Sequence, residues 1–565
     1  MRLFRRAWLL PLWAHCLAFA GLLVVVAPLL RIDEAFTIDE GAYGIQVRAL
    51  DRGGWAYEYA GEEVDSELEW LPLYNPTRGE DGAYPYVKHP FYPVAQLGAS
   101  RLVGDVVGVH LWALLGALGV AVAAWLVAGE IEPSARRAAF WVAAAAPVLV
   151  NAYIVWAHAP SAALAGFAVL AGLRAARALQ WRWALLLAAC LGVGVLIRAE
   201  MLLFALALAG AMAVGLWRRG LAWAAGVPVL CAAAGAGAVL VESRWRRSIV
   251  GRSSSVAGFR GEDGSPFAGS GGLSSLTRWV EGRAEGAWNS LFQGSLGEQR
   301  AALLVAGGMV MVLFGAWVAR RRRPNWQRDT LVAMAVATLL YALRLRSDAT
   351  QPITGFLAAW PLALLGLVLV PREHLRKAHV LVVSVGLFSL AVLATQYRIG
   401  GGREWGGRFF FPMVVPVAVL ACLGLRHGLA SARADRAAWK ALAGLGVLLA
   451  VLPTVAGFRV LHTSRTQVGA ILREVAGGEP TLIMTHVSGL PPFAWQEYPE
   501  VGWLAVPPRE FAEVAARLRA AGVEDLLLLG PKTTEPTDVP TYTAEDVTGP
   551  EADRRGWRTF RLRAP

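Results

Sequence analysis

The sequence has few cysteines and few charged residues, and each shortage excludes a class of protein. All four cysteines lie in apolar segments, and none belongs to a CxxC or Cys/His pattern: Cys16, Cys190, Cys231 and Cys422. A disulfide framework or a zinc module is therefore not expected. Charged residues make up 17% of the chain and hydrophobic residues 56%, a balance that a soluble protein of 565 residues does not have.

The net charge of +12 does not indicate nucleic-acid binding. Such binding needs basic residues gathered on one soluble module with interleaved aromatic residues. Here the arginines lie between apolar runs, where Lys and Arg mark the cytoplasmic ends of membrane helices. We therefore expect membrane lipids, and no nucleic acid, as partners.

Apolar stretches near the length of a membrane span, about 20 residues, recur along most of the chain. We count thirteen: 7–30, 106–128, 138–154, 159–173, 183–197, 201–217, 221–241, 301–319, 330–345, 353–370, 378–396, 409–425 and 438–458. The stretches near 159, 183 and 330 are short, with only about 15 residues between their charged flanks. The sequence therefore predicts an α-helical polytopic membrane protein with about 11–13 transmembrane helices.

The basic clusters predict the orientation of these helices. If the amino terminus lies inside and the helices alternate, clusters such as Arg136-Arg137 and Arg218-Arg219 all fall on the cytoplasmic side. Thirteen crossings then place the carboxyl terminus outside. We expect a multi-pass plasma-membrane protein with a cytoplasmic amino terminus.

The polar segments divide the chain into two predicted domains. Residues 1–460 form a transmembrane domain with two long extracytoplasmic loops, an ordered one at 31–105 and a flexible, Gly- and Ser-rich one at 242–300. Residues 461–565 form a small extracytoplasmic α/β domain, with strands at 481–484 and 525–530 and an amphipathic helix at 509–521. Juxtamembrane helices are expected on the outer face.

The paired carboxylates Asp39 and Glu40 directly follow the first apolar stretch, at the start of a predicted amphipathic helix. A carboxylate in this place could act as a general base. The structural alternative is that Asp39 caps the helix and Glu40 complements its dipole. The spacing leaves both interpretations open.

The segment Lys88-His89-Pro90-Phe91-Tyr92-Pro93 ends the same loop. Its prolines predict an extended backbone. This backbone would hold Lys88 at the membrane surface, either against an anionic head group or as an ordinary interfacial anchor.

Ionisable residues of both signs gather at the predicted outer ends of the helices. An outer pocket lined by such residues is a functional hypothesis, although single arginines often only extend to the interface. The further candidates for contact with substrate are His158, Arg198, Arg346, Arg403, Glu404 and Arg408.

These features resemble the GT-C superfamily of polytopic glycosyltransferases, which includes protein mannosyltransferases (glycosyltransferase family 39) and aminoarabinose transferases. The resemblance rests on the Asp-Glu pair, on the Lys88 segment, and on 407–412, Gly-Arg-Phe-Phe-Phe-Pro, which is similar to an Arg-aromatic-Pro helix start. In architecture it extends over residues 1 to about 430. It implies an inverting transfer of sugar from a polyprenyl-phosphate donor to an unknown glycan, lipid or protein acceptor.

The resemblance also implies roles for individual residues. Asp39 would take the proton from the acceptor, supported by Glu40. The phosphate of the donor would be bound by Lys88, His89, Arg198, Arg346 and Arg408. Substrate contacts are expected from His158, Arg403 and Glu404. His158 stands where many relatives carry an acidic residue, so the resemblance does not extend to a second carboxylate or to a metal site built on it. A divalent metal stays open as a cofactor, without assigned ligands.

Other functions remain open at this point, among them a polymer ligase that uses lipid diphosphates, which the sequence does not distinguish from the glycosyltransferase. A transporter or flippase of lipid-linked saccharides could bind the same anion, but the charges lie at helix ends and no internal repeat is evident. A non-catalytic envelope assembly protein would leave the Asp39 and Lys88 segments without a role.

Overall fold

The computed structural model describes residues 10–73, 76–80, 82–145, 147–217, 220–251, 283, 290–291, 355–395, 406–432, 436–476, 482–487, 489–535 and 541–565. The predicted spans 301–319 and 330–345 lie outside these residues. By its internal contacts the chain forms two compact units. We call Met1–Val26, Trp112–Ser243 and Ser255–Val460 the helical unit, and Ala27–Leu111, Arg244–Ser254 and Leu461–Pro565 the mixed unit.

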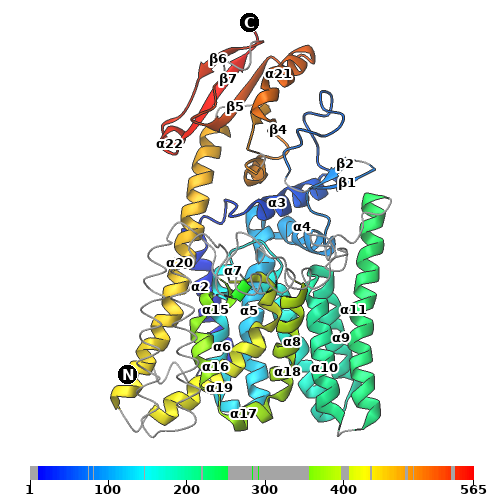
Figure 1. The fold of residues 1–565 in the computed structure, drawn as a ribbon, viewed down its shortest axis with the longest axis vertical. Helices are drawn as coiled ribbons and strands as arrows, with labels where there is room; N and C mark the ends of the chain where they lie inside the picture. Colours follow the sequence, from blue (N-terminus) through cyan, green and yellow to red (C-terminus); the bar gives the residue numbers. More distant parts are fainter. Residues whose placement is uncertain are drawn as a thin grey trace, which may run out of the picture. The chain divides into compact units, whose positions relative to one another are not determined.

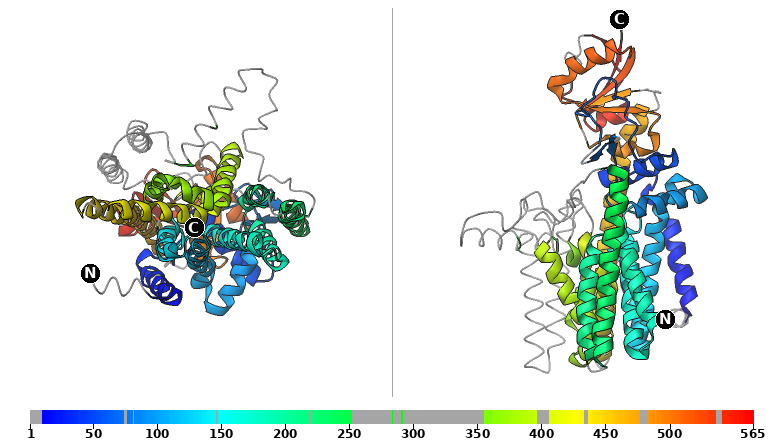
Figure 2. Two further views of the ribbon diagram at one scale, coloured as in Figure 1. Left: turned by 90° about the horizontal axis from the view of Figure 1, so that it is seen from below. Right: turned by 90° about the vertical axis from the view of Figure 1, so that its right-hand side faces the viewer.

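The helical unit is a bundle of apolar helices. Its described elements are α2 (Leu12–Val26), η2 (Pro133–Ala135), α6 (Arg136–Ala144), α7 (Val148–Asn151), α8 (His158–Ala178), α9 (Trp181–Ile197), α10 (Glu200–Leu216), α15 (Phe356–Ala359), α16 (Pro361–Val368), α17 (Arg372–Lys377), α18 (His379–Thr395), η5 (Arg408–Met413) and α19 (Val414–Ala432). Helix α8 packs against α9 and α10, and α10 packs against α18 (Figures 1 and 2). Three long helices run through both units: α5 (Asp105–Ile131), α11 (Leu221–Val250) and α20 (Arg436–Ala476).

The predicted multi-pass helical fold is confirmed. Within the described ranges, six helices are long and apolar enough to cross a membrane, and three shorter apolar helices accompany them. Helix α20 has 41 residues and is therefore about 60 Å long, roughly twice the hydrocarbon thickness of a bilayer. Its first half is the more apolar one and is by itself long enough to span a membrane.

Two predicted spans are wrong in detail because each is broken at a proline. The stretch 138–154 divides into α6 and α7, with Ala145 extended and Pro147 opening the second helix. The stretch 353–370 divides into α15 and α16 at the non-helical Trp360, which precedes Pro361. A proline disfavours the helical conformation of the residue before it and removes a backbone donor.

Two other boundaries are also corrected. Helix α8 is longer than the predicted 159–173 because Arg174 and Arg177 continue it and form ion pairs with Glu130. The helix therefore continues past these charged residues, because a carboxylate is close enough to form ion pairs with them. The first nine residues of the predicted flexible loop, 242–250, are helical and belong to α11, and most of the rest of that loop lies outside the described residues.

The mixed unit combines short helices with two sheets. Its first segment contains η1 (Pro28–Leu30), α3 (Ile38–Asp51), the hairpin of β1 (Thr77–Gly79) and β2 (Gly82–Tyr84), and α4 (Phe91–Val103). Its last segment contains β3 (Leu482–Thr485), η6 (Pro491–Glu497), β4 (Gly502–Ala505), η7 (Pro508–Glu510), α21 (Phe511–Ala520), β5 (Asp525–Pro531), β6 (Thr543–Asp546), α22 (Pro550–Arg554) and β7 (Trp557–Arg563). These elements confirm the predicted C-terminal α/β fold.

The larger sheet has the strand order β4-β3-β5-β7-β6. Strand β3 pairs in parallel with β4 and β5, and β7 pairs antiparallel with β5 and β6. Ile471, Leu472 and Val475 from the end of α20 pack into one apolar core with Ile483 and Leu527 of the sheet. Packing of α20 on the sheet therefore joins the long helix to this domain.

Helix α3 packs closely against η6 through two glycines on one face. A Cβ atom at Gly41 would run into the backbone carbonyl of Pro492, and one at Gly44 into the ring of Trp495. Any larger residue at these positions would push η6 away, so the glycines fix the distance between α3 and the C-terminal segment.

We predict that Gly41→Ala destabilises the protein by about 1–3 kcal/mol, the usual range for overpacking, because the contacting atom is backbone and cannot rotate away. A thermal unfolding scan in detergent measures the effect. Gly98→Ala in α4 is the matched control, because no atom lies within 4 Å of its Cβ position. Equal melting temperatures for both variants would contradict the packing described above.

Candidate functional site

The start of α3 carries both predicted catalytic carboxylates. Thr37 is the N-cap, and its hydroxyl oxygen accepts a hydrogen bond from the backbone N–H of Glu40 at 3.2 Å. The Glu40 carboxylate reaches back to accept from the N–H of Phe36. The pair is a variant of the capping box, because the Glu40 carboxylate bonds the N–H of the residue before the N-cap and not that of the N-cap itself. The structural alternative that Asp39 caps the helix is therefore wrong.

Glu40 and Asp39 lie in opposite environments. Glu40 is buried, with 2% of its surface exposed, and Arg465 of α20 donates to its two carboxylate oxygens at 3.3 and 3.4 Å. Arg465 is 0% exposed and also donates to the carbonyl oxygen of Leu30 at 3.2 Å. Asp39, one residue earlier, is exposed. The adjacent acids are thus one accessible carboxylate and one structural anion.

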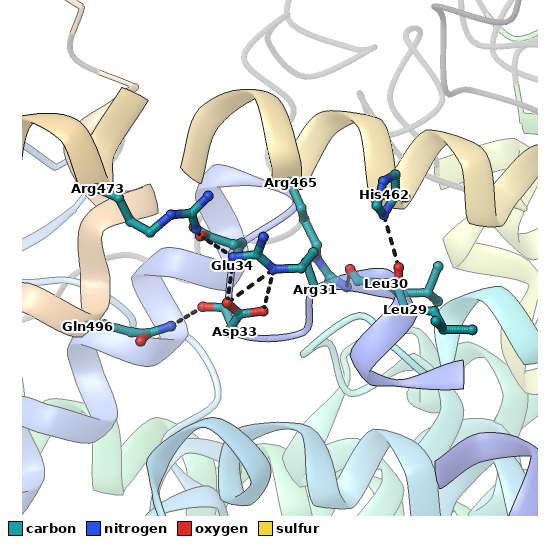
Figure 3. Close-up of polar contacts among 9 residues, drawn as sticks. All are labelled: Leu29, Leu30, Arg31, Asp33, Glu34, His462, Arg465, Arg473 and Gln496. Carbon is teal, nitrogen blue, oxygen red and sulfur yellow. Dashed lines mark hydrogen bonds and ion pairs between the residues drawn. The ribbon is translucent and has the colours of Figure 1, made fainter. Parts of the chain in front are cut away.

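The polar residues on α20 contact the segment that leads into α3 (Figure 3). His462 Nδ1 lies 2.9 Å from the carbonyl oxygen of Leu29, and Arg473 forms an ion pair with Glu34. Figure 3 shows the side chains of His462, Arg465 and Arg473 projecting from α20 toward residues 29–34. The long helix therefore holds the connection between α2 and α3 at several points.

Asp33 lies within the same cluster. Arg31 donates to both of its carboxylate oxygens, with the shortest distance 2.9 Å. Burial alone would raise the pKa of Asp33, but the hydrogen bonds and charge of Arg31, with a smaller contribution from Arg473, lower it overall. The ionised form of Asp33 is therefore the form that stabilises this segment.

The predicted phosphate ligands Lys88 and His89 precede α4. Lys88 is exposed and His89 is buried. The predicted extended backbone is wrong here, because Pro90 is helical and forms the N-cap of α4. Pro is compatible with the first turn of a helix, where its missing N–H removes no hydrogen bond.

A buried glutamine ties this segment to α3. Gln46 is 0% exposed, and its side chain accepts from the N–H of Tyr86 at 3.0 Å and donates to the carbonyl oxygen of Trp55 at 2.9 Å. The rings of Tyr43 and Tyr86 lie 3.8 Å apart by their centroids. The Asp39 helix and the segment before Lys88 are therefore held together.

A second cluster lies in the helical unit, where α9, α10, α8 and η5 meet. Arg198 ends α9 and donates to Glu200 of α10 at 3.0 Å. His158 opens α8, and the charges of Arg198 and Arg408 both act on its ring. The guanidinium of Arg408 lies over the rings of Trp156 and Phe409, 5.9 and 4.8 Å from their centroids. Three predicted site residues, His158, Arg198 and Arg408, are thus brought together.

Two glycines place Arg408 in this cluster. Gly406 and Gly407 have φ values of 83° and 61°, a left-handed conformation that residues with a Cβ atom rarely adopt. A Cβ at Gly406 would contact Pro147, and one at Gly407 would contact the backbone of Phe356 and Ser290. The Gly-Gly pair thus allows the chain to turn tightly into η5, where Arg408 is the first residue.

Trp156 Nε1 and His158 Nε2 are buried in this cluster and have no hydrogen-bond partner among the residues that the structure describes. The two rings are perpendicular, with centroids 5.1 Å apart. Leaving a buried polar atom unpaired costs about 1–3 kcal/mol, and such atoms are a common mark of a ligand site. The cluster therefore offers two ring nitrogens for hydrogen bonding beside the guanidinium groups of Arg198 and Arg408.

One functional residue, Arg465, is not among those predicted from the sequence. Arg465 was missed because it follows an apolar stretch and looks like an ordinary end-of-span arginine. Its spacing to His462 and Arg473, three and eight residues, would have shown a polar face on one helix. The predicted site residues Arg346, Arg403 and Glu404 lie outside the described residues.

A metal site was left open by the sequence. Within the part of the chain that the structure describes, no group of three or more His, Cys, Asp or Glu side chains is arranged to hold a metal ion.

The bundle of membrane-length helices and the small α/β domain define a multi-pass membrane protein. No protein-family model matches the sequence, and no curated protein is significantly similar to it. Among solved structures, ArnT from Cupriavidus metallidurans bound to undecaprenyl phosphate matches with a TM-score of 0.51 and 14% identity, over 96% of this chain and 97% of that chain. The apo form of ArnT matches with a TM-score of 0.42 and 15% identity, over 96% of this chain and 98% of that chain.

The match to the lipid-bound form, with a TM-score of 0.51, establishes the fold. ArnT is an aminoarabinose transferase with a GT-C fold, and the match to its lipid-bound form extends over nearly the whole of both chains. The predicted likeness to GT-C membrane glycosyltransferases is thus confirmed at the level of fold.

We predict that acid destabilises the connection between α2 and α3 through Asp33. Because the pKa of Asp33 is lowered in the folded protein, its contribution is complete above the unfolded pKa of about 3.9 and is lost as the pH falls through the folded value. Melting temperatures measured between pH 6 and pH 3 should therefore fall less steeply for Asp33→Asn than for the native chain. Glu535→Gln, at an exposed acid, is the control, and a native slope in Asp33→Asn would contradict the role given to Asp33.

Proposed function

We propose that this chain is an inverting glycosyltransferase that moves a sugar from a polyprenyl-phosphate donor to an acceptor at the extracytoplasmic face of the plasma membrane. The GT-C fold supports a lipid-phosphate donor, because the ArnT structure with the matching fold was solved with undecaprenyl phosphate bound. The arrangement of basic loops supports a cytoplasmic amino terminus and an extracytoplasmic C-terminal domain.

The observation that carries the proposal is that Asp39 is exposed whereas the adjacent Glu40 is buried and hydrogen-bonded. Glu40 is buried and bound by Arg465 and by the N–H of Phe36, so its carboxylate is occupied. Asp39 is exposed on the first turn of the same helix. A general base must be able to reach the proton that it removes, and of the two acids Asp39 meets this condition.

In the proposed reaction, the Asp39 carboxylate takes the proton of the acceptor nucleophile while that nucleophile attacks the anomeric carbon. The bond between this carbon and the phosphate oxygen breaks, and its electron pair leaves with the polyprenyl phosphate. Attack opposite the leaving group inverts the anomeric configuration. Glu40 takes no proton and keeps the first turn of α3 in place.

The departing phosphate gains negative charge, so positioned cations and N–H donors favour the transition state. Exposed Lys88 and its neighbour His89 are candidates in the mixed unit. Arg198 and Arg408 are candidates in the helical unit, because guanidinium groups match phosphate oxygens. Trp156 and His158 offer their unpaired nitrogens to phosphate or sugar oxygens. Arg346, Arg403 and Glu404 keep the roles proposed from the sequence.

We predict that Asp39→Asn lowers sugar transfer by about 100- to 10,000-fold while donor binding is retained, because the substitution removes the base but little volume. Transfer from synthetic polyprenyl-phosphate sugars to a panel of acceptors is measured with purified protein in detergent. Asp51→Asn, the same change at the exposed last residue of α3, is the matched control and should stay near native activity.

Two different results would contradict this proposal. Native turnover by Asp39→Asn would remove the base assignment. Donor binding without turnover by the native protein, across the whole acceptor panel, would favour a transporter of lipid-linked saccharides instead.

A further inference from the structure

The second half of α20 presents one polar face to the segment that leads into α3. His462, Arg465, Gly469 and Arg473 are spaced by three, four and four residues, so they lie on one face of the helix. Each meets the segment 29–40: His462 at Leu29, Arg465 at Leu30 and Glu40, and Arg473 at Glu34. At Gly469 a Cβ atom would overlap the Glu34 carboxylate. We call these four residues the α20 clamp.

Arg465 makes the most demanding contact in the α20 clamp. Its guanidinium and the Glu40 carboxylate are 0% and 1% exposed. A buried charge is tolerated only when it is paired and hydrogen-bonded. One planar group here bonds two carboxylate oxygens and a backbone carbonyl together, which the single ammonium group of lysine cannot reproduce in the same geometry.

The fixed Glu40 side chain sets the direction of Asp39. Successive residues on an α-helix point about 100° apart around its axis. With Glu40 drawn toward Arg465 and its backbone N–H bonded to Thr37, the first turn of α3 cannot rotate. The neighbouring Asp39 is then held in the exposed direction in which it is found.

We propose that Arg465 is a positioning residue for catalysis, acting through Glu40 to hold Asp39 at the angle that proton transfer needs. This inference rests on the proposed function, in which Asp39 is the base. It gives the second half of α20 a role in the reaction, although Arg465 itself contacts neither sugar nor phosphate in this scheme. Small displacements of a catalytic group can lower the rate by about 100-fold.

The test compares four variants in the full-length protein. Arg465→Met should lower kcat about 10- to 100-fold with the donor KM within about twofold of native, because the base is displaced and the donor contacts remain. Arg465→Lys should recover part of that loss. Arg459→Met, at an exposed arginine on the same helix, is the matched control and should keep native kcat.

The fourth variant separates positioning from folding. Arg465→Met leaves Glu40 as an unpaired buried charge, so some loss of stability is expected. Glu40→Gln/Arg465→Met removes both charges and should recover the melting temperature, while kcat stays low. If the double variant regained native kcat together with its stability, Arg465 would be only a structural residue and the proposal would be overturned.

Hydrogen exchange supplies a measurement that does not depend on activity. In Arg465→Met, the backbone amide of Phe36 should exchange about 10-fold faster than in the native chain, because its acceptor, the Glu40 carboxylate, loses its fixed position. Native exchange rates or native kcat in this variant would overturn the proposal. If the native protein transferred no sugar from any donor, the proposed function would fail, and exchange at Phe36 would still decide whether Arg465 holds the start of α3.

Discussion

Two full charges, on Glu40 and Arg465, lie almost out of reach of solvent, and much of the mixed unit is arranged around them. Neither charge would be stable there alone. Further hydrogen bonds surround the ion pair. The Glu40 carboxylate accepts from the N–H of Phe36, the Glu40 N–H donates to Thr37, and Arg465 donates to the carbonyl oxygen of Leu30. Because these groups come from segments more than 400 residues apart in sequence, the pair joins the start of α3 to helix α20.

The remainder of the mixed unit reinforces this connection. Glycines on α3 let η6 approach closely, and apolar residues at the end of α20 form the core beneath the five-stranded sheet. Along its length, helix α20 therefore has three parts. An apolar stretch of membrane-spanning length comes first, the α20 clamp follows, and an apolar face at the end packs on the five-stranded sheet. In this way a single helix connects the membrane bundle, the Asp39 segment and the C-terminal domain.

In the described part of the helical unit, charged groups lie among apolar helices and need partners there. Arg198 is balanced by Glu200, and Arg408 lies over aromatic rings that tolerate a cation. The unpaired nitrogens of Trp156 and His158 give this cluster a capacity for hydrogen bonding beyond its charges.

The sequence alone determined the membrane helices, because twenty apolar residues have few stable environments other than lipid. It also located the Asp-Glu pair and the C-terminal strands through local patterns. It could not assign different roles to Asp39 and Glu40, since the partner of Glu40 is 425 residues away. Nor could hydropathy find the breaks at Pro147 and Pro361. Only tertiary contacts decided which acid is buried, because burial depends on what the rest of the chain brings to it.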